Sequence, residues 1–334
     1  MGLNTHNESF ISDLSKEVRC RIWWSLYTLY TLLSTITGRP SRAPRDYCTT
    51  KIPSPYDESI FQTQPVNDPD GDRRSGLAIS RSLVHVSAKA SRQPIGSALG
   101  GSRSESKPQE SISVEDPGSE SGSGAVYFLC TVNITILIRE AVDNIYAPGL
   151  GSKPWPLIEG TIAALDARAN RWLHSLPSYY QFQEEVGPGL SRERVSLAFL
   201  FFSTKLFICQ PCILRFLPVP THDMIPCRQE AKSNMASVCV QAAMDILRLL
   251  PDEPDLHWFY ETCPWWCFLH YLMQAVAVCL TAIFISPRSV SDESLCMEAA
   301  VSKAMRWLSS ISSTNPSSEA ALRICTEIIA RMRP

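Results

Sequence analysis

The sequence predicts an all-α protein, and three observations support that fold class. Hydrophobic residues recur at spacings of three and four over long windows, which is the pattern of one helix face. Proline and glycine fall where those windows end. Paired runs of alternating apolar and polar residues, which would indicate strands, are not apparent. With 45% hydrophobic residues in 334, the chain has enough apolar side chains to bury a core.

The first predicted helix begins near Ser12 and ends at Gly38, followed by Pro40. Ser12 is a typical N-cap residue, Gly38 tolerates left-handed geometry, and Pro40 prevents continuation. A helix of about 25 residues is on the order of 37 Å long. One apolar stripe has spacings of four, three, four and three, and it consists of Ile22, Leu26, Leu29, Leu33 and Ile36.

This helix contains no charged residue between Ile22 and Gly38. Trp23, Tyr27 and Tyr30 widen the apolar stripe on one side, and many of the remaining positions are Ser or Thr. Residues that small can lie close against another helix. We therefore expect this helix to be enclosed on most sides.

The composition changes after the first helical block, which we assign to residues 1–60. Between Gly71 and Gly124, 14 of 54 residues are Ser and 8 are Gly, with no sustained helical stripe. Such a segment cannot bury enough apolar surface to offset the entropy of ordering. We assign 61–124 as a disordered Ser/Gly-rich insertion or linker.

Residues 125–334 form the helical remainder of the predicted domain. The β-branched run after Tyr127 would suit a strand, but its length and its continuation through Arg139-Glu140-Ala141 favour a helix. Together with the first helix, about eight helices are expected. The seven in this region are 127–146, 158–176, 192–208, 232–250, 265–285, 292–311 and one beginning at Pro316.

The window 265–285 contains no Lys, Arg, Asp or Glu and is the most hydrophobic part of the chain. By length and composition it could cross a bilayer. A buried core helix is the competing interpretation, and the weakly charged flanks favour it. A single-span membrane-associated helical accessory protein therefore stays the alternative function.

The chemistry of the chain points away from an enzyme, and we assign no catalytic, cofactor-binding or metal-binding residue. A net charge of −2 and a pI near 6.3 do not suit a nucleic-acid-binding surface. The nearest basic cluster, Arg39, Arg42 and Arg45, is expected to be a solvated loop.

The twelve cysteines are scattered, which suits buried small hydrophobic side chains in a reducing compartment. Only Cys209 and Cys212 have the CxxC spacing of a metal or redox motif, and they end an apolar helix rather than follow a strand. Cys263 and Cys267 are expected to serve packing. Among the histidines, His222 next to Asp223 and His257 near Glu261 suit surface or capping contacts, and His270 suits the core.

Two stretches of residues resemble a known family. Arg19-Cys20-Arg21-Ile22-Trp23-Trp24, followed by Gly38-Arg39-Pro40, resembles the signature of the fungal-specific transcription factor domain. Lys51-Ile52-Pro53-Ser54-Pro55-Tyr56-Asp57 resembles the segment that follows in that family. Trp172 with the Leu176-Pro177 helix exit is similar to a second family feature. At the exit of the helix 192–208, Gln210 in Cys209-Gln210-Pro211-Cys212 stands where the family commonly has an arginine.

The resemblance implies an all-helical regulatory domain of a fungal zinc-cluster transcription factor. Met1-Gly2-Leu3-Asn4 resembles the end of the preceding family helix, so the expectation is a chain that is N-terminally truncated and lacks the zinc-cluster DNA-binding module. The family further implies the nucleus and control of a metabolic or secondary-metabolite biosynthesis gene cluster.

The expected partners are other transcription regulators or the transcription machinery, in a homo- or heterodimer, with no direct nucleic-acid binding and no membrane. A small-molecule effector is also implied, in a helical pocket. Six aromatic residues are candidates to line it, with core packing the leading interpretation: Trp23, Trp24, Tyr27, Tyr30, Trp265 and Trp266.

Overall fold

A computed structural model describes residues 12–39, 50–56, 124–147, 153–182, 190–215, 234–285 and 292–332. These residues form nine α-helices and one short 3₁₀ helix, η3 (Ser178–Tyr180), with no strand among them. The all-α prediction is confirmed. The α-helices are α1 (Asp13–Thr37), α4 (Gly124–Ile145), α5 (Trp155–His174), α6 (Arg192–Leu214), α7 (Asn234–Leu249), α8 (Leu256–Thr262), α9 (Trp265–Ile285), α10 (Asp292–Ser312) and α11 (Pro316–Met332).

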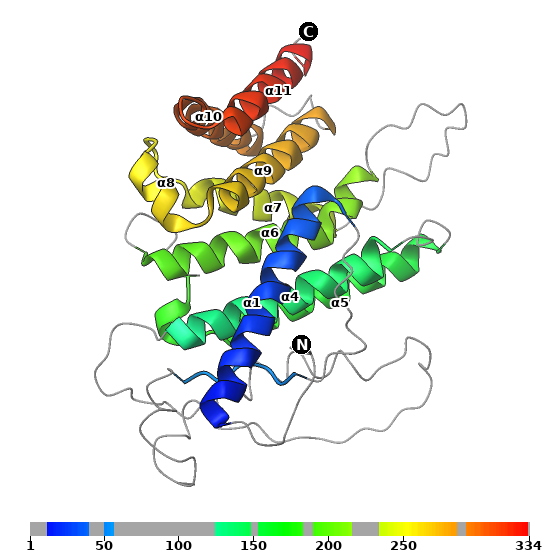
Figure 1. The fold of residues 1–334 in the computed structure, drawn as a ribbon. Helices are drawn as coiled ribbons and strands as arrows, with labels where there is room; N and C mark the ends of the chain where they lie inside the picture. Colours follow the sequence, from blue (N-terminus) through cyan, green and yellow to red (C-terminus); the bar gives the residue numbers. More distant parts are fainter. Residues whose placement is uncertain are drawn as a thin grey trace.

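The helices from α4 onward are stacked in chain order (Figure 1). α4 and α5 form one end of the stack, α6 and α7 follow, and α9 connects them to α10 and α11 at the other end. Helix α1 crosses the face of this stack and packs on α4. The Ser/Gly-rich stretch 61–124 lies outside the described residues except for Gly124, where α4 begins.

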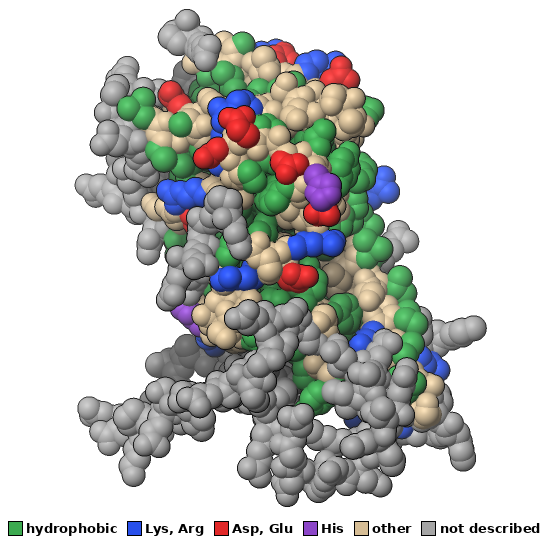
Figure 2. All heavy atoms as spheres, turned by 90° about the vertical axis from the view of Figure 1, so that its left-hand side faces the viewer, with side chains coloured by type: hydrophobic (Ala, Val, Ile, Leu, Met, Phe, Trp, Pro, Cys, Tyr) green, Lys and Arg blue, Asp and Glu red, His purple; other side chains and the backbone are tan. Residues whose placement is uncertain are grey.

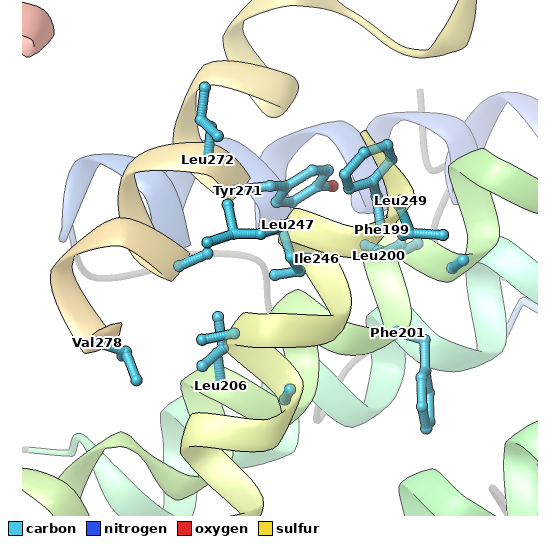
Figure 3. Packing of buried hydrophobic residues seen from close by; sticks show 14 of the residues in the cluster. Phe199, Leu200, Phe201, Leu206, Ile246, Leu247, Leu249, Tyr271, Leu272 and Val278 are labelled. Atoms are coloured by element: carbon cyan, nitrogen blue, oxygen red, sulfur yellow. The ribbon is translucent and has the colours of Figure 1, made fainter. Parts of the chain in front are cut away.

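One hydrophobic core runs through the stack from α4 to α11. Figure 3 shows part of it, where Phe199 and Leu206 of α6 lie among side chains of α7 and α9. Phe199 stacks on Tyr271, with ring centroids 6.1 Å apart and an interplanar angle of 11°. The predicted stripe of α5 faces this core, since Ile162, Ala169 and others along it are buried.

Buried ion pairs connect α5 to the helices on either side of it. Arg168 of α5 pairs with Glu140 of α4, whose side chain is 4% exposed. Lys205 of α6 pairs with Asp166 of α5 at 3.1 Å and also donates to Asn170 Oδ1 at 2.9 Å. Each charge has an opposite charge beside it, so the burial of these groups is compensated.

Helix α6 continues past its expected end at Ile208 to Leu214, with Pro211 inside it. Proline has no N–H, so the carbonyl of Phe207, four residues earlier, loses its helical donor. The hydroxyl of Tyr146 donates to that carbonyl at 2.6 Å, and its ring stacks on Phe207 with centroids 4.4 Å apart. A tertiary contact therefore allows the helix to pass through the proline.

Helix α8 was not expected from the sequence. Asp255 caps it by accepting from the backbone N–H groups of His257 at 2.8 Å and Trp258 at 3.3 Å. The ring of Trp258 lies 5.4 Å from that of Trp307 in α10. A helix of seven residues is too short to show a periodic apolar stripe in the sequence. Such a short helix is marginal by itself, and aromatic packing on its neighbours stabilises it.

Three described helices are long and apolar enough to cross a membrane: α4, α6 and α9. Length and composition therefore do not distinguish α9 from two other helices of the stack. Helix α9 contacts α6, α7, α8, α10 and α11. These contacts bury 44% of its most apolar window, against 72% in α4 and 67% in α6.

Candidate functional site: helix α1 and the segment bound along it

The segment Lys51–Tyr56 is bound along the first half of α1 through side chains of the signature residues. Trp24 Nε1 donates to the Lys51 carbonyl at 2.7 Å, and Cys20 Sγ lies 3.0 Å from the same oxygen. Trp24 and Cys20 are one helical turn apart, so they reach one acceptor from the same face. The two stretches that resemble the family are thus in direct contact.

An ion pair fixes the far end of this segment. Glu17 Oε1 accepts from Arg21 Nε at 2.9 Å and from the backbone N–H of Ser54 at 2.9 Å. Arg21 also donates to the carbonyl of Tyr56. Both charged side chains are largely buried, at 17% and 12% exposure. The Glu17 carboxylate and the Arg21 guanidinium both bind backbone groups of this segment. Their contacts therefore fix the conformation of Lys51–Tyr56 on α1.

The face of α1 that packs on α4 differs from the one expected. A small apolar cluster of Cys20, Trp24 and Tyr27 meets Val132 and Ile136 of α4, with Trp23, Ile52 and Phe128 packed against it. Further along α1 the buried residues are Thr31 and Ser34. These two small residues are enclosed as predicted from their size, whereas Ser25 and Thr37 are exposed.

The predicted apolar stripe, in contrast, is largely exposed, and the expectation that α1 is enclosed on most sides is wrong. Ile22 is 45% exposed, Leu26 51%, Leu29 45% and Leu33 41%. Ile36 alone is partly buried against the core. The reason is that Trp24 and Tyr27 turn toward α4 and fix the rotation of the helix, which places the aliphatic side chains opposite. We call Ile22, Leu26, Leu29 and Leu33 the α1 seam.

The structure separates the six aromatic residues considered for a pocket. Trp24 and Tyr27 are buried in the small cluster at α4, and Trp23 packs against it. Tyr30 is exposed beside the α1 seam. Trp265 is exposed at the start of α9, and Trp266 packs against the main core. None of the six lines either of the two cavities described next.

A small cavity lies between α1, α4, α6 and α9. Thr35 and Ile36 of α1 line it together with Ser203 of α6 and His270 and Gln274 of α9. Ser203 donates to the Gln274 side-chain oxygen at 2.7 Å. The volume is about 20 Å³, enough for about one water molecule. Burial lowers the pKa of His270 from 6.5 to about 4, so this imidazole is neutral at pH 7.

A larger groove of about 430 Å³ lies between α7 and α10. Val238, Met244 and Met297 supply apolar walls, and Arg248 and Gln241 supply polar groups. Cys296, the exposed one of the ten described cysteines, is at its edge. Sequence reasoning did not find this groove, because its walls come from helices 50 residues apart.

The remaining chemical candidates are structural. Cys209 and Cys212 are buried within α6, and burial raises the pKa of Cys209 well above its usual value. Cys263 ends α8 rather than sharing a helix with Cys267, and burial raises the pKa of Cys267 to about 12. Thiols in this state are poor nucleophiles, as the packing interpretation requires.

His257 lies on the surface, 3.2 Å from Glu261, in agreement with its predicted surface role. No group of three His, Cys, Asp or Glu side chains suited to a metal occurs in the described residues. His222, Arg42 and Arg45 lie outside them.

Comparison with known proteins connects the whole chain to transcription regulators of fungi. The chain is 28% identical to transcription regulator galc of Aspergillus niger over 373 aligned residues, which cover 100% of this chain and 42% of that protein. It is 30% identical to sorbicillinoid biosynthetic cluster transcription factor 2 of Penicillium rubens over 135 residues, or 36% of this chain and 19% of that protein. No family model and no solved structure matches the chain. The chain spans less than half the length of these relatives.

Proposed function

We propose that this chain is a regulatory helical region of a fungal transcription regulator of the zinc-cluster type, acting in the nucleus through contacts with other proteins. The similarity to transcription regulator galc along the entire chain is the observation that carries this proposal. The all-α stack supports it, as does the contact between the two stretches that resemble the regulatory domain.

We further propose that its targets are genes of a metabolic or secondary-metabolite biosynthesis cluster. The support is the second relative, which is named for a sorbicillinoid biosynthetic cluster. The groove between α7 and α10 is the candidate position for a small-molecule effector, because its volume falls in the range of ligand pockets.

The experiment is to delete and separately overexpress the gene in its host, and to compare transcript levels genome-wide. The proposal predicts coordinated changes in a small set of neighbouring genes, together with nuclear accumulation of a fluorescent fusion. Overexpression of the Trp24→Ala variant, which releases the segment held by α1 without touching the α7–α10 groove, tests whether that contact is needed for the transcript changes. Unchanged transcripts in both strains, with the fusion excluded from nuclei, would overturn the proposal.

A further inference from the structure

Ser54 lies at the centre of the segment that α1 holds, next to the largely buried ion pair. Its backbone N–H donates to Glu17 Oε1 at 2.9 Å, and its hydroxyl accepts from the N–H of Tyr56 at 3.3 Å. Ser54 is half-buried, whereas the prolines on either side of it, Pro53 and Pro55, are buried. The segment is therefore held through its backbone and its prolines, and the serine side chain between them is only partly covered.

The residue after Ser54 defines the kind of enzyme that can modify this hydroxyl. Pro55 has no N–H, so a kinase that binds the amide after its acceptor serine rejects this site, and a proline-directed kinase accepts it. Residues 50–56 form neither helix nor strand, so a kinase can bind them as an extended chain once they leave α1. The sequence contains a second such pair, Ser286-Pro287, which lies outside the described residues.

A phosphate on Ser54 would meet a negative charge that is already in place. Phosphoserine carries about −1.5 to −2 charges at pH 7. The Glu17 carboxylate binds the N–H of the same residue, so the two anions would be close neighbours. Arg21, the cation of the pair, already binds Glu17 and the Tyr56 carbonyl. Since Arg21 and Glu17 are only 17% and 12% exposed, water screens the repulsion weakly.

The wider surface does not supply an obvious counterweight. Figure 2 shows acidic and basic side chains interspersed over one face of the stack, without a broad positive patch that would hold a phosphorylated segment in place. In Figure 1 the segment 50–56, in lighter blue, crosses the first half of α1. The contacts with α1 therefore decide whether the segment stays bound.

We propose that Ser54 is a phosphorylation site and that its modification releases the segment Lys51–Tyr56 from α1. The co-reactant is ATP, bound by a proline-directed kinase. Ser54 Oγ attacks the γ-phosphorus and an O–P bond forms. The bond from that phosphorus to the β,γ-bridging oxygen breaks, ADP leaves with the electron pair, and the hydroxyl proton passes to the general base of the kinase. Repulsion from Glu17 then separates the N–H of Ser54 from its acceptor, and the bonds of Trp24 and Arg21 to the same segment are lost with it.

This inference goes beyond the proposed function and does not depend on it, because it is tested on the purified full-length chain. Every protein in the test carries Ser286→Ala, so that Ser54-Pro55 is the remaining Ser-Pro pair. The chain is incubated with a proline-directed kinase and ATP, and phosphate is located by mass spectrometry of its peptides. We expect phosphate on Ser54 and loss of this incorporation in Ser54→Ala. Absence of phosphate from Ser54 would overturn the proposal.

Hydrogen exchange measured by mass spectrometry reports the release. In the phosphorylated chain, the amides of Ser54 and Tyr56 are expected to exchange at least about tenfold faster, as in Trp24→Ala, while α6 and α9 keep their protection. Ser25→Glu, at an exposed serine of α1, is the matched control for added negative charge and leaves the segment bound. Unchanged exchange in the phosphorylated chain would overturn the proposal.

The variant Glu17→Gln separates charge repulsion from a merely bulky modification. The glutamine amide oxygen still accepts from the Ser54 N–H but carries no charge, and the Arg21 guanidinium can then turn to the phosphate. Phosphorylation of Glu17→Gln is therefore expected to preserve the protection of the segment. Equal release with and without the Glu17 charge would show that repulsion is not the cause, and the proposed mechanism would be wrong.

Discussion

The contact between α1 and α4 depends most on Trp24, and the substitution Trp24→Ala tests its role. Trp24 is buried, its ring lies 5.1 Å from that of Tyr27 in an edge-on arrangement, and its indole N–H binds the Lys51 carbonyl at 2.7 Å. The small cluster around it is separate from the main core and contains only two buried residues of α4. We therefore expect the loss to be local, releasing α1 and the Lys51–Tyr56 segment.

The magnitude follows from what is removed. Truncating a buried tryptophan to alanine costs about 3–5 kcal/mol, which includes the cavity left behind. The equilibrium between bound and released α1 then shifts by on the order of a hundredfold or more. Trp24→Phe keeps most of the apolar contact and loses the indole hydrogen bond, at about 1 kcal/mol.

Hydrogen exchange measured by mass spectrometry is the assay. Amides of α1 are expected to exchange on the order of a hundredfold faster in Trp24→Ala, whereas amides of α6 and α9 keep their protection. Trp265→Ala, at a largely exposed tryptophan of α9, is the matched control and leaves α1 unchanged. Loss of protection in α6 and α9 together with α1 would show that α1 belongs to the main cooperative unit, and our reasoning would be wrong.

Three further predictions concern the stack. Tyr146→Phe removes the donor to the Phe207 carbonyl and is expected to lower the free energy of unfolding by about 1 kcal/mol in urea titrations; an unchanged midpoint would contradict the contact. Glu140→Ala leaves Arg168 without its buried partner and is expected to cost about 3–5 kcal/mol in the same assay, and a loss below 1 kcal/mol would show that water reaches this pair. His270 has a folded-state pKa of about 4 against 6.5 when unfolded, so the unfolded chain binds the extra proton as pH falls through this window. The free energy of unfolding should therefore decrease between about pH 6.5 and 4, by up to roughly 3 kcal/mol, and His270→Gln should remove that part of the slope.

The sequence predicted most helices of the stack correctly because each has one continuous apolar face. The stripe of α5, from Ile158 to Trp172, faces the core as expected. The capping signals were also correct, since Ser12 accepts from the Ser15 N–H and Gly38 adopts φ 64°. In α4 the β-branched run favoured a strand locally, and burial along a long helix outweighed that preference.

Two errors at helix ends have a common cause. The end of α6 was placed at Ile208, although the helix continues through Pro211 to Leu214. The hydroxyl of Tyr146, just after α4 and 61 residues before Phe207, replaces the donor that Pro211 lacks. Helix α8 was missed because its stability comes from aromatic contacts with α9 and α10. Neither contact leaves a signal in the local sequence.

The candidate site shows the same division between local and tertiary information. The sequence identified the residues of α1 and of the segment 51–57 as related, through their resemblance to one family. It did not show that Trp24, Cys20 and Glu17 bind that segment directly, since these bonds span 27 to 37 residues. Nor did it reveal the groove between α7 and α10.

By itself the sequence determined that α1 is a helix, where it begins and ends, and that it has an uncharged aliphatic stripe. Periodicity and capping are local properties, so a single chain segment specifies them. Only the tertiary structure decided which face of α1 is buried. On the side that faces α4, Trp24 buries a large ring and donates its indole N–H to the Lys51 carbonyl. These two contributions together outweighed the burial of four aliphatic side chains. The stripe was therefore left exposed.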